Sequence, residues 1–383
     1  MRALAGRVWA VIAANSGLLI GGTLFGLLWA NLSRDTYEPF AHALEFAVND
    51  VGMVFFFALA TKEIVEAMLP GGALSSPREA ALPVLAACGG MLMPALLYLT
   101  YSTLLGRPDL HRGWAIPCAT DIAFSYLAAR FIFPREHPAI PFLLLLAIAD
   151  DALGLVILAL FYPARAISFA SFFALMTPAL VLAWMFRRRR VHSFWPYVAV
   201  AGSCSWVALY LGGFHPALAL VAIVPFMPAA RRDLGVLAEG EPLRRDTLSH
   251  FEEWWNLPVQ VVLFFFGLVN AGVPLTTVGA ATWMVLSALL LGKPLGILML
   301  SYAGVVLGLR LPRGIRTREM VIVGIAAGIG FTVALFFATA AFPNGGVLLD
   351  EAKMGALLSF AAAPIAIGIG RLVGVTPASR WPR

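Results

Sequence analysis

Long apolar stretches recur along almost the whole chain and limit what it can fold into. Of its 383 residues, 60% are hydrophobic and only 13% are charged, and the mean hydropathy is +0.85. A soluble domain needs charged residues at about a quarter of its positions. A transmembrane helix needs about 20 apolar residues, so the chain has room for roughly a dozen spans with short loops. We therefore expect an all-α polytopic membrane protein that forms a single transporter domain over residues 1–383.

Hydropathy predicts about twelve transmembrane helices. The first follows Arg2 and Arg7, and its apolar stretch is too long for a cleaved signal peptide, which indicates a retained helix. The two short spans that meet at Gly212 and Gly213 could also be one long interrupted span. The expected spans lie near residues 8–30, 48–69, 83–105, 114–133, 140–161, 167–186, 196–211, 213–230, 254–271, 280–308, 320–342 and 353–374.

Basic residues are distributed unevenly among the loops between these spans. Lys and Arg concentrate in cytoplasmic loops of membrane proteins. A cytoplasmic N-terminus puts most of the 27 basic residues in cytoplasmic segments, so we expect both termini there. Cytoplasmic Lys and Arg residues of this kind set the topology and lie next to anionic lipid. They explain the net charge of +6, so no nucleic-acid partner is needed. The residues assigned to the cytoplasm are Arg2, Arg7, Lys62, Arg78, Arg130, Arg135, Arg187 to Arg190, Arg231, Arg232, Arg244, Arg245, Arg310, Arg313, Arg316, Arg318, Arg371, Arg380 and Arg383.

Two adjacent acidic residues, Asp150 and Asp151, lie in the apolar segment 143–158. A charged side chain at mid-bilayer is costly and usually has a function. Neighbouring residues on a helix point about 100° apart, so both carboxylates can flank one cavity. Repulsion and desolvation favour the protonated form, and a carboxylate that binds either a proton or a hard cation such as Na+ couples the two by competition. The alternative is a pair neutralised by a basic residue only to fix helix packing.

A third buried acid, Asp121, follows Pro117 and Thr120 inside another apolar span. Proline removes a backbone donor, and Thr and Asp favour helix caps, so we expect a break with a second half-helix beginning at Thr120 or Asp121. There a carboxylate would offset positive dipole ends. Capping and direct ion ligation both fit Asp121.

One buried base, Lys293, lies within the apolar segment 289–297. Its candidate partners are the three buried aspartates, and a Lys–Asp pair that opens when a cation arrives would release a proton or free a ligand. Snorkelling to the membrane interface is the alternative.

Three glycines, Gly324, Gly328 and Gly330, weaken the span 320–342 near its middle. A helix break there would give each half of the chain one interrupted span, as in transporters with a site between repeats. Close helix packing is the alternative reason for these glycines. Cys88, Cys118 and Cys204 lack the spacing of zinc ligands or disulfides and are expected to be small core residues.

Several motifs together resemble the NhaA family of sodium/proton antiporters, and the resemblance covers nearly the whole chain in order. It implies a twelve-helix protein of the bacterial inner membrane that exchanges cytoplasmic Na+ or Li+ for a larger number of external protons. It also implies two inverted repeats with broken helices crossing at mid-membrane, an architecture for which this family is an established example. The motifs are Ala119-Thr-Asp-Ile-Ala-Phe124, Leu146-Ala-Ile-Ala-Asp-Asp151, Leu291-Gly-Lys-Pro-Leu-Gly-Ile297 and Gly328-Ile-Gly-Phe-Thr332, with further matches at 114–124 and 48–50.

The resemblance also implies roles for single residues. Asp151 would be the central ligand for Na+ or Li+, and Asp150 its companion carboxylate, with Lys293 as salt-bridge partner. Thr120 and Asp121 would lie where the two broken helices cross, and Asp121 and Lys293 would offset opposite dipole ends.

The cytoplasmic end of the second span departs from the family pattern. The family's Leu-Glu-Val-Lys-Arg-Glu-Leu reads here Lys62-Glu-Ile-Val-Glu-Ala-Met68, and only Glu63 matches. The family is thought to sense pH in this region, so the pH of activation does not transfer, although His215 also matches a family histidine. Lys62 and Glu66 have the spacing of a helical surface pair.

Two other classes also place charge in the membrane. Intramembrane aspartyl proteases carry a Gly-x-Gly-Asp motif, which this sequence lacks. A sodium- or proton-coupled transporter of another solute could use the buried lysine for an anion, but the acidic pair favours a cation. We therefore predict a pH-regulated, electrogenic antiporter in membrane lipid, without catalytic chemistry, cofactor or nucleic-acid partner. A second copy of the chain, in a homodimer, is a further candidate partner.

Overall fold

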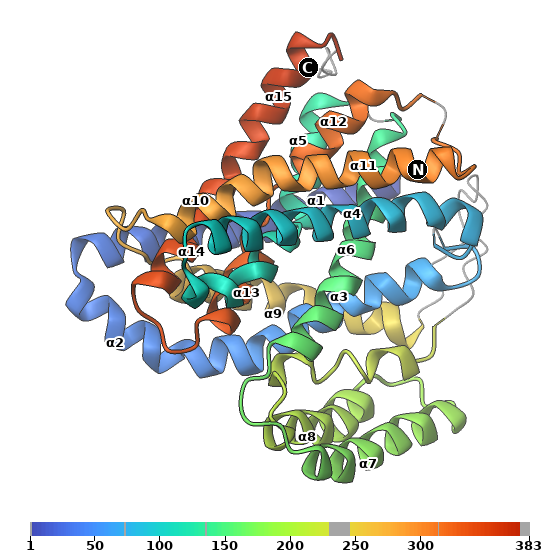
Figure 1. Ribbon diagram of the computed structural model, residues 1–383. Coiled ribbons are helices and arrows are strands. Elements are labelled where there is room, and N and C mark those ends of the chain that lie inside the picture. Colours follow the sequence, from blue (N-terminus) through green and yellow to red (C-terminus); the bar gives the residue numbers. More distant parts are fainter. Residues whose placement is uncertain (1, 73, 135, 230–245, 313, 376–383) are drawn as a thin grey trace. The chain divides into compact units, whose positions relative to one another are not determined.

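The computed structural model describes residues 2–72, 74–134, 136–229, 246–312 and 314–375 (Figure 1). These residues form α-helices joined by short 3-10 and π segments, and none of the described ranges contains a strand. The expected all-α class is therefore confirmed. The chain divides into two compact units, each built from two stretches that are distant in sequence, residues 1–75 with 155–272 and residues 76–154 with 273–383.

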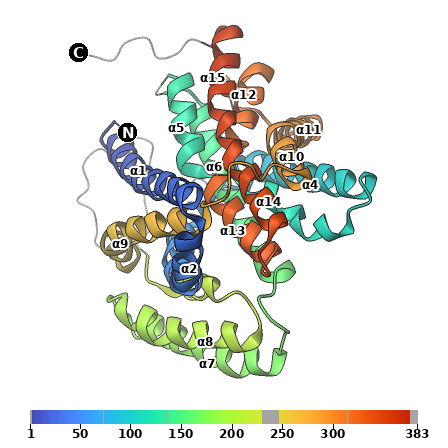
Figure 2. The same ribbon diagram turned by 90° about the vertical axis from the view of Figure 1, so that its left-hand side faces the viewer.

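In the first unit, α1 packs closely against α9 through glycines. A Cβ atom on Gly26 would lie 2.5 Å from the carbonyl oxygen of Leu268, so a side chain there would push the helices apart. The helices α7 and α8 lie side by side (Figure 2). The elements of this unit are α1 (Arg2–Leu32), α2 (Arg34–Glu45), η1 (Phe46–Gly52), α3 (Met53–Met68), α7 (Phe169–Arg188), η3 (Tyr197–Gly202), α8 (Ser203–Gly212), η4 (Pro216–Leu218), η5 (Val224–Phe226) and α9 (Thr247–Asn270).

The span expected at 48–69 is the second half of a longer helix. The segments α2, η1 and α3 follow one another without a gap and run over 35 residues, Arg34–Met68, and only Ser33 separates α1 from α2. Within the π segment η1, Asn49 exchanges side-chain hydrogen bonds of 3.3 and 2.9 Å with Asn270 of α9. Such a buried amide pair fixes the register between two helices.

The span expected at 213–230 is not a regular helix. Gly213 has a φ of +87° and ends α8 in the left-handed conformation, which glycine adopts without a steric penalty. The residues that follow form turns and the two short 3-10 segments η4 and η5, each of which contains a proline. Hydropathy detects that this stretch is buried but does not detect these breaks.

In the second unit, α4 packs against α11 with the two backbones in contact. A Cβ atom on Gly296 would lie 1.9 Å from the carbonyl oxygen of Gly89. The helix α6 continues into the first unit after Gly154. The elements are α4 (Pro77–Leu104), η2 (Pro108–Cys118), α5 (Ile122–Ile132), α6 (Ala139–Phe161), α10 (Ala280–Ser287), η6 (Ala288–Gly292), α11 (Lys293–Val306), α12 (Thr317–Ala327), α13 (Phe331–Ala341), α14 (Val347–Leu358), η7 (Ser359–Ala361) and α15 (Ala362–Leu372).

Both expected helix breaks are confirmed in this unit. The pair η2 and α5 bends by 54°, and the pair α12 and α13 bends by 50°. The first break follows Pro117, which cannot donate a backbone hydrogen bond. The second spans Gly328 and Gly330, residues with low helix propensity.

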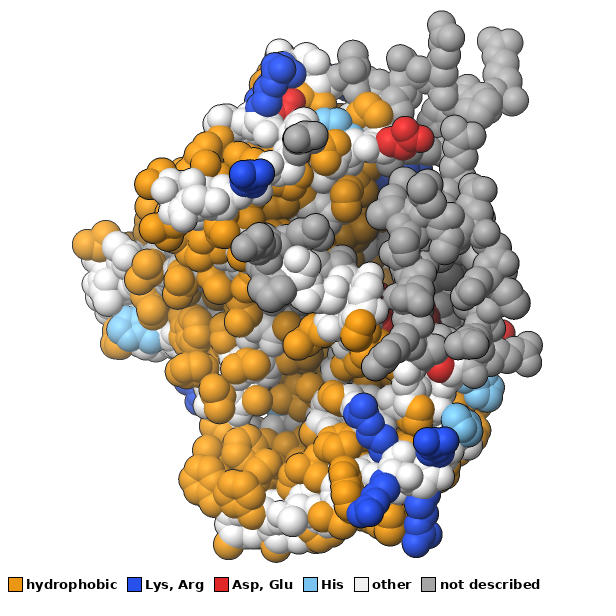
Figure 3. Space-filling model, turned by 90° about the vertical axis from the view of Figure 1, so that its right-hand side faces the viewer, with side chains coloured by type: hydrophobic (Ala, Val, Ile, Leu, Met, Phe, Trp, Pro, Cys, Tyr) orange, Lys and Arg blue, Asp and Glu red, His pale blue; other side chains and the backbone are white. Residues whose placement is uncertain are grey.

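The described helices have the length and surface of membrane-spanning segments. Six of them are long and apolar enough to cross a bilayer, or eight when each bent pair counts as one span, so the number twelve stays a prediction. Hydrophobic side chains cover wide areas of the surface, as lipid-facing helices require (Figure 3). Of the arginines behind the predicted orientation, those at 135, 231, 232, 244, 245, 313, 380 and 383 lie outside the described residues.

Candidate functional site

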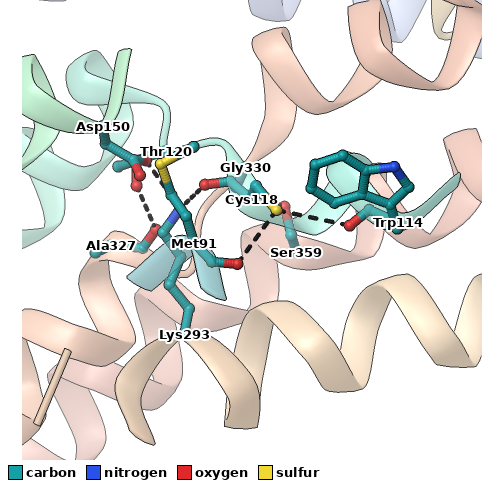
Figure 4. A network of polar contacts seen from close by, with 9 residues as sticks. All are labelled: Met91, Trp114, Cys118, Thr120, Asp150, Lys293, Ala327, Gly330 and Ser359. Atoms are coloured by element: carbon teal, nitrogen blue, oxygen red, sulfur yellow. Dashed lines mark hydrogen bonds and ion pairs between the residues drawn. The ribbon is translucent and has the colours of Figure 1, made fainter. Parts of the chain in front are cut away.

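The two helix breaks of the second unit are joined directly by hydrogen bonds. The backbone N–H of Asp121 donates to the carbonyl of Ile329 at 2.7 Å. The hydroxyl of Thr120 donates to the carbonyl of Ala327 at 3.1 Å (Figure 4). Ala327 is the last residue of α12, so each break supplies partners for backbone groups that the other leaves unpaired. Residues 120–121 and 327–329 therefore form one buried crossing.

The carboxylate of Asp121 caps two half-helices at once. Its Oδ1 accepts a 3.3 Å hydrogen bond from the backbone N–H of Phe124, in the first turn of α5. Its Oδ2 accepts hydrogen bonds from the N–H of Thr332, at 3.2 Å, and from the Thr332 hydroxyl. Thr332 lies in the first turn of α13. One negative charge thus faces the positive ends of two helix dipoles.

The ammonium of Lys293 lies at the opposite kind of helix end. Its Nζ donates to the carbonyl of Cys118, the last residue of η2, and to Oδ2 of Asp150 at 2.9 Å (Figure 4). Neither the Lys293 nor the Asp150 side chain is exposed. Lys293 starts α11 directly after the π segment η6. The sequence left three aspartates as partners for this lysine, and the geometry selects Asp150.

Two carboxylate positions near this ion pair have no partner among the described residues. The buried Oδ1 of Asp150 accepts no hydrogen bond of regular distance and angle from the described residues, although Thr120 lies close enough to interact with this carboxylate. Asp151 is partly exposed, and no residue in the described part of the chain forms a hydrogen bond or ion pair with its side chain. Buried acceptors without partners are costly and commonly mark functional positions. Oxygens of this kind are the ligands that hard cations prefer.

The described residues contain no group of three or more His, Cys, Asp or Glu side chains that could hold a metal ion. The cysteines are all free. Cys118 is buried, as expected of a core residue, and its thiol donates to the carbonyl of Met91 at 3.4 Å, whereas Cys88 and Cys204 are only partly buried.

The first unit contains an ion cluster that the sequence did not reveal in full. The Nζ of Lys62 lies 3.1 Å from Glu63, 2.9 Å from Glu66 and 2.6 Å from Glu252 of α9. The expected pair of Lys62 and Glu66 exists, but it is not a surface pair, because Lys62 is only 2% exposed. Hydropathy could not predict the contact of Lys62 with Glu252, because Glu252 is distant in sequence and precedes the span expected at 254.

The histidine that matches the NhaA pattern, His215, lies beside Asp50, an acid outside the Lys62 cluster. Its Nδ1 is 3.9 Å from Oδ1 of Asp50, in the π segment η1. The backbone carbonyl of Asp50 accepts a 2.8 Å hydrogen bond from the indole of Trp206. Glu63 and His215 thus belong to the first unit, whereas all five residues predicted to form or support the cation site belong to the second.

Sequence comparison finds one family over almost the full chain. The profile of the family described as Na+/H+ antiporter 1 matches residues 4–371. The Na(+)/H(+) antiporter NhaA of Desulfitobacterium hafniense is 45% identical over 365 residues, which cover 93% of this chain and 94% of that protein. The NhaA of Geobacter sulfurreducens is also 45% identical, with 93% and 95% covered. The NhaA of Jannaschia sp. is 42% identical, with 96% and 98% covered.

A solved structure shares the fold at much lower sequence identity. The sodium proton antiporter MjNhaP1 from Methanocaldococcus jannaschii, determined at pH 8, superimposes with a TM-score of 0.55 and 14% identity. The match covers 97% of this chain and 98% of that one. Helical architecture is therefore retained where most side chains differ.

Proposed function

The chain belongs to the Na+/H+ antiporter 1 family, and on that premise we propose that it exchanges cytoplasmic Na+ or Li+ for external H+. The observation that carries the proposal is the ion pair of Asp150 with Lys293 next to Asp151, which has no described partner. The protein is a multi-pass membrane protein and a secondary transporter, and its transport requires no catalytic chemistry.

Competition for the two carboxylates is the proposed coupling mechanism. Asp151 and the free Oδ1 of Asp150 offer oxygen ligands to Na+ or Li+. A proton on either carboxylate removes the negative charge that the cation needs, so the two ions exclude each other at the site. A cation beside Asp150 also weakens the attraction between Asp150 and Lys293, because it supplies the same charge as the ammonium.

The neighbouring residues support this site in the proposed mechanism. Asp121 and Lys293 offset opposite helix ends, and Thr120 ties the two breaks together. Two carboxylates and one lysine can together release more than one proton for each cation bound, which makes the exchange electrogenic. The half-helices meet next to groups of both charges, so a small shift at the crossing changes the environment of the ion.

A pH response is proposed for two residues of the first unit. Glu63 contacts the buried Lys62, and His215 lies beside Asp50. Protonation of either residue changes the charge of its cluster. Because the Lys62 cluster departs from the family pattern, we expect a distinct pH of activation.

The proposed location is the bacterial inner membrane, with both termini in the cytoplasm. The distribution of Lys and Arg between the predicted loops supports this orientation. Exposed apolar side chains such as Leu28 and Val306 face lipid in this arrangement. A second copy of the chain remains a candidate partner.

An ion-exchange assay in proteoliposomes tests the proposal. A pH gradient is imposed, Na+, Li+ or K+ is added in turn between pH 6.5 and 9, and dequenching of a pH-sensitive dye is recorded. Dequenching with Na+ or Li+ that is lost in Asp151→Asn would support the site. Asp109→Asn is the matched control, because it removes the same charge from an exposed residue in the first turn of η2. If the folded wild-type protein caused no dequenching with any of the three cations, the proposed exchange would be contradicted.

A further inference from the structure

The last long helix is distorted where it passes the crossing of the broken helices. The segments α14, η7 and α15 form one apolar stretch, Val347–Leu372, interrupted by the 3-10 segment Ser359–Ala361. Ser359 is fully buried. Its hydroxyl donates to the carbonyl of Ala356 at 2.6 Å. The same hydroxyl accepts a 3.2 Å hydrogen bond from the backbone N–H of Gly330, and both Ser359 and Gly330 are labelled in Figure 4.

The bond to Gly330 places Ser359 at the start of a half-helix. Gly330 is the residue directly before α13, so its N–H belongs to the end that lacks intrahelical partners. Ser359 accepts the hydrogen bond of the Gly330 N–H, and Asp121 accepts that of the Thr332 N–H, two residues after Gly330. The first turn of α13 is therefore held from two sides, by the other broken helix and by the last helix.

The next residue, Phe360, contacts both half-helices. Its ring centroid lies 4.8 Å from that of Phe124 and 4.5 Å from that of Phe331. Phe124 and Phe331 are themselves 5.6 Å apart in an edge-to-face contact. Phe331 is the first residue of α13, and Phe124 donates the backbone N–H that Asp121 accepts. Such aromatic contacts stabilise the packing of the helices by more than the burial of their apolar area alone.

A continuous set of contacts leads from Ser359 to the ion pair. Ser359 holds Gly330, and the adjoining residue Ile329 accepts the N–H of Asp121. Three residues before Asp121, the carbonyl of Cys118 accepts from Lys293, the partner of Asp150. Within the described residues, neither Ser359 nor Phe360 forms a hydrogen bond or ion pair with the carboxylates, so their hydrogen bonds and ring contacts reach the ion through the crossing.

We infer that Ser359 and Phe360 are positioning residues for ion exchange, which fix the starts of α5 and α13 and thereby set the geometry around Asp150 and Lys293. This inference rests on the proposed function. Loss of the Ser359 hydroxyl leaves a backbone donor of α13 unpaired and loosens the crossing. A looser site discriminates less sharply between ions of different radius, and Li+, the smaller ion, requires the closer arrangement of oxygens.

The test is the kinetics of Ser359→Ala in proteoliposomes. We expect the apparent KM for Li+ to rise about fivefold, as the loss of one ordinary hydrogen bond implies, and the KM for Na+ to rise less, with a smaller change in maximal rate. Ser359→Thr should restore both constants. Ser102→Ala is the matched control, because Ser102 is also buried and its hydroxyl donates to a backbone carbonyl, that of Arg107, away from the crossing. Phe360→Leu should act like Ser359→Ala, and Phe360→Tyr should not.

Unchanged KM values and an unchanged ratio of Li+ to Na+ in Ser359→Ala and Phe360→Leu would overturn the inference. So would a lower yield of folded protein with normal constants for each folded molecule, since that is a purely structural effect. If the wild-type protein exchanges no ion, the proposed function fails. Ion-dependent thermal stabilisation of the solubilised protein then decides the inference, which requires a smaller shift with LiCl in Ser359→Ala than in Ser102→Ala.

Discussion

The Nζ of Lys293 lies 2.9 Å from Oδ2 of Asp150, and neither side chain is exposed. A buried ion pair of this kind contributes little net stability, but removing one partner leaves an uncompensated charge. Its value for exchange is that one carboxylate oxygen is held by the lysine while the other, Oδ1, has no described hydrogen-bond partner. In the proposed mechanism this oxygen is the one that coordinates the cation.

Removal of the lysine alone should therefore destabilise the protein more than removal of the pair. We expect Lys293→Met to lower the free energy of unfolding by about 3–5 kcal/mol, because Asp150 stays buried without its partner. Lys293→Met combined with Asp150→Asn should recover much of this loss. Thermal unfolding of the single and double variants in detergent measures the coupling, and additive effects would show that the two side chains act independently.

Asp121 should be essential for stability through its acceptor oxygens. Asp121→Ala removes the caps of α5 and α13, and we expect a loss of about 2 kcal/mol, about 1 kcal/mol for each helix start. Asp121→Asn keeps one acceptor oxygen and should lose less. Unfolding temperatures of both variants check this order. Equal destabilisation by Ala and Asn would mean that the charge, rather than the cap, stabilises the crossing.

The apparent KM for Na+ should depend on pH with a defined sign. If protons compete with the cation for Asp150 and Asp151, as proposed, lowering the pH should raise the KM, by about tenfold per pH unit where one proton competes. Exchange rates at several Na+ concentrations between pH 6.5 and 9 give this dependence. A KM that stays constant while only the maximal rate changes would argue against competition at a shared site.

The Lys62 cluster should stabilise the first unit through its single cation. Lys62→Met leaves Glu63, Glu66 and Glu252 close together, and we expect a loss of about 2 kcal/mol, less than for a wholly buried pair because Glu63 and Glu252 are partly exposed. Lys62→Arg should retain most of the stability. Adding Glu66→Gln to Lys62→Met should restore part of it, and no recovery would mean that lost packing of the lysine stem dominates.

The sequence predicted the parts of the fold that depend on local chemistry. Charges inside apolar stretches identified Asp150, Asp151, Asp121 and Lys293, and Pro117 indicated one of the two helix breaks. These signals are local because a charge in hydrocarbon or a missing backbone donor is unfavourable whatever packs around it.

Contacts between distant segments were beyond the reach of the sequence. Nothing near Lys62 indicates that Glu252 will meet it, and a serine within an apolar helix, as at 359, has the same appearance whether or not it holds another backbone. Thr332 belonged to a motif, but its hydrogen bonds to Asp121 depend on how two breaks align. These pairings are set by packing, which hydropathy does not describe.

The shared cap at Asp121 joins a local contact to a contact between segments that are distant in sequence. The N-terminal break is synthesised first and carries its own cap, since Asp121 and Phe124 are three residues apart. The start of α13 needs an acceptor that lies 211 residues earlier in the chain. We therefore expect the cap of α5 to be available from local sequence alone, whereas the cap of α13 forms only when the two breaks meet.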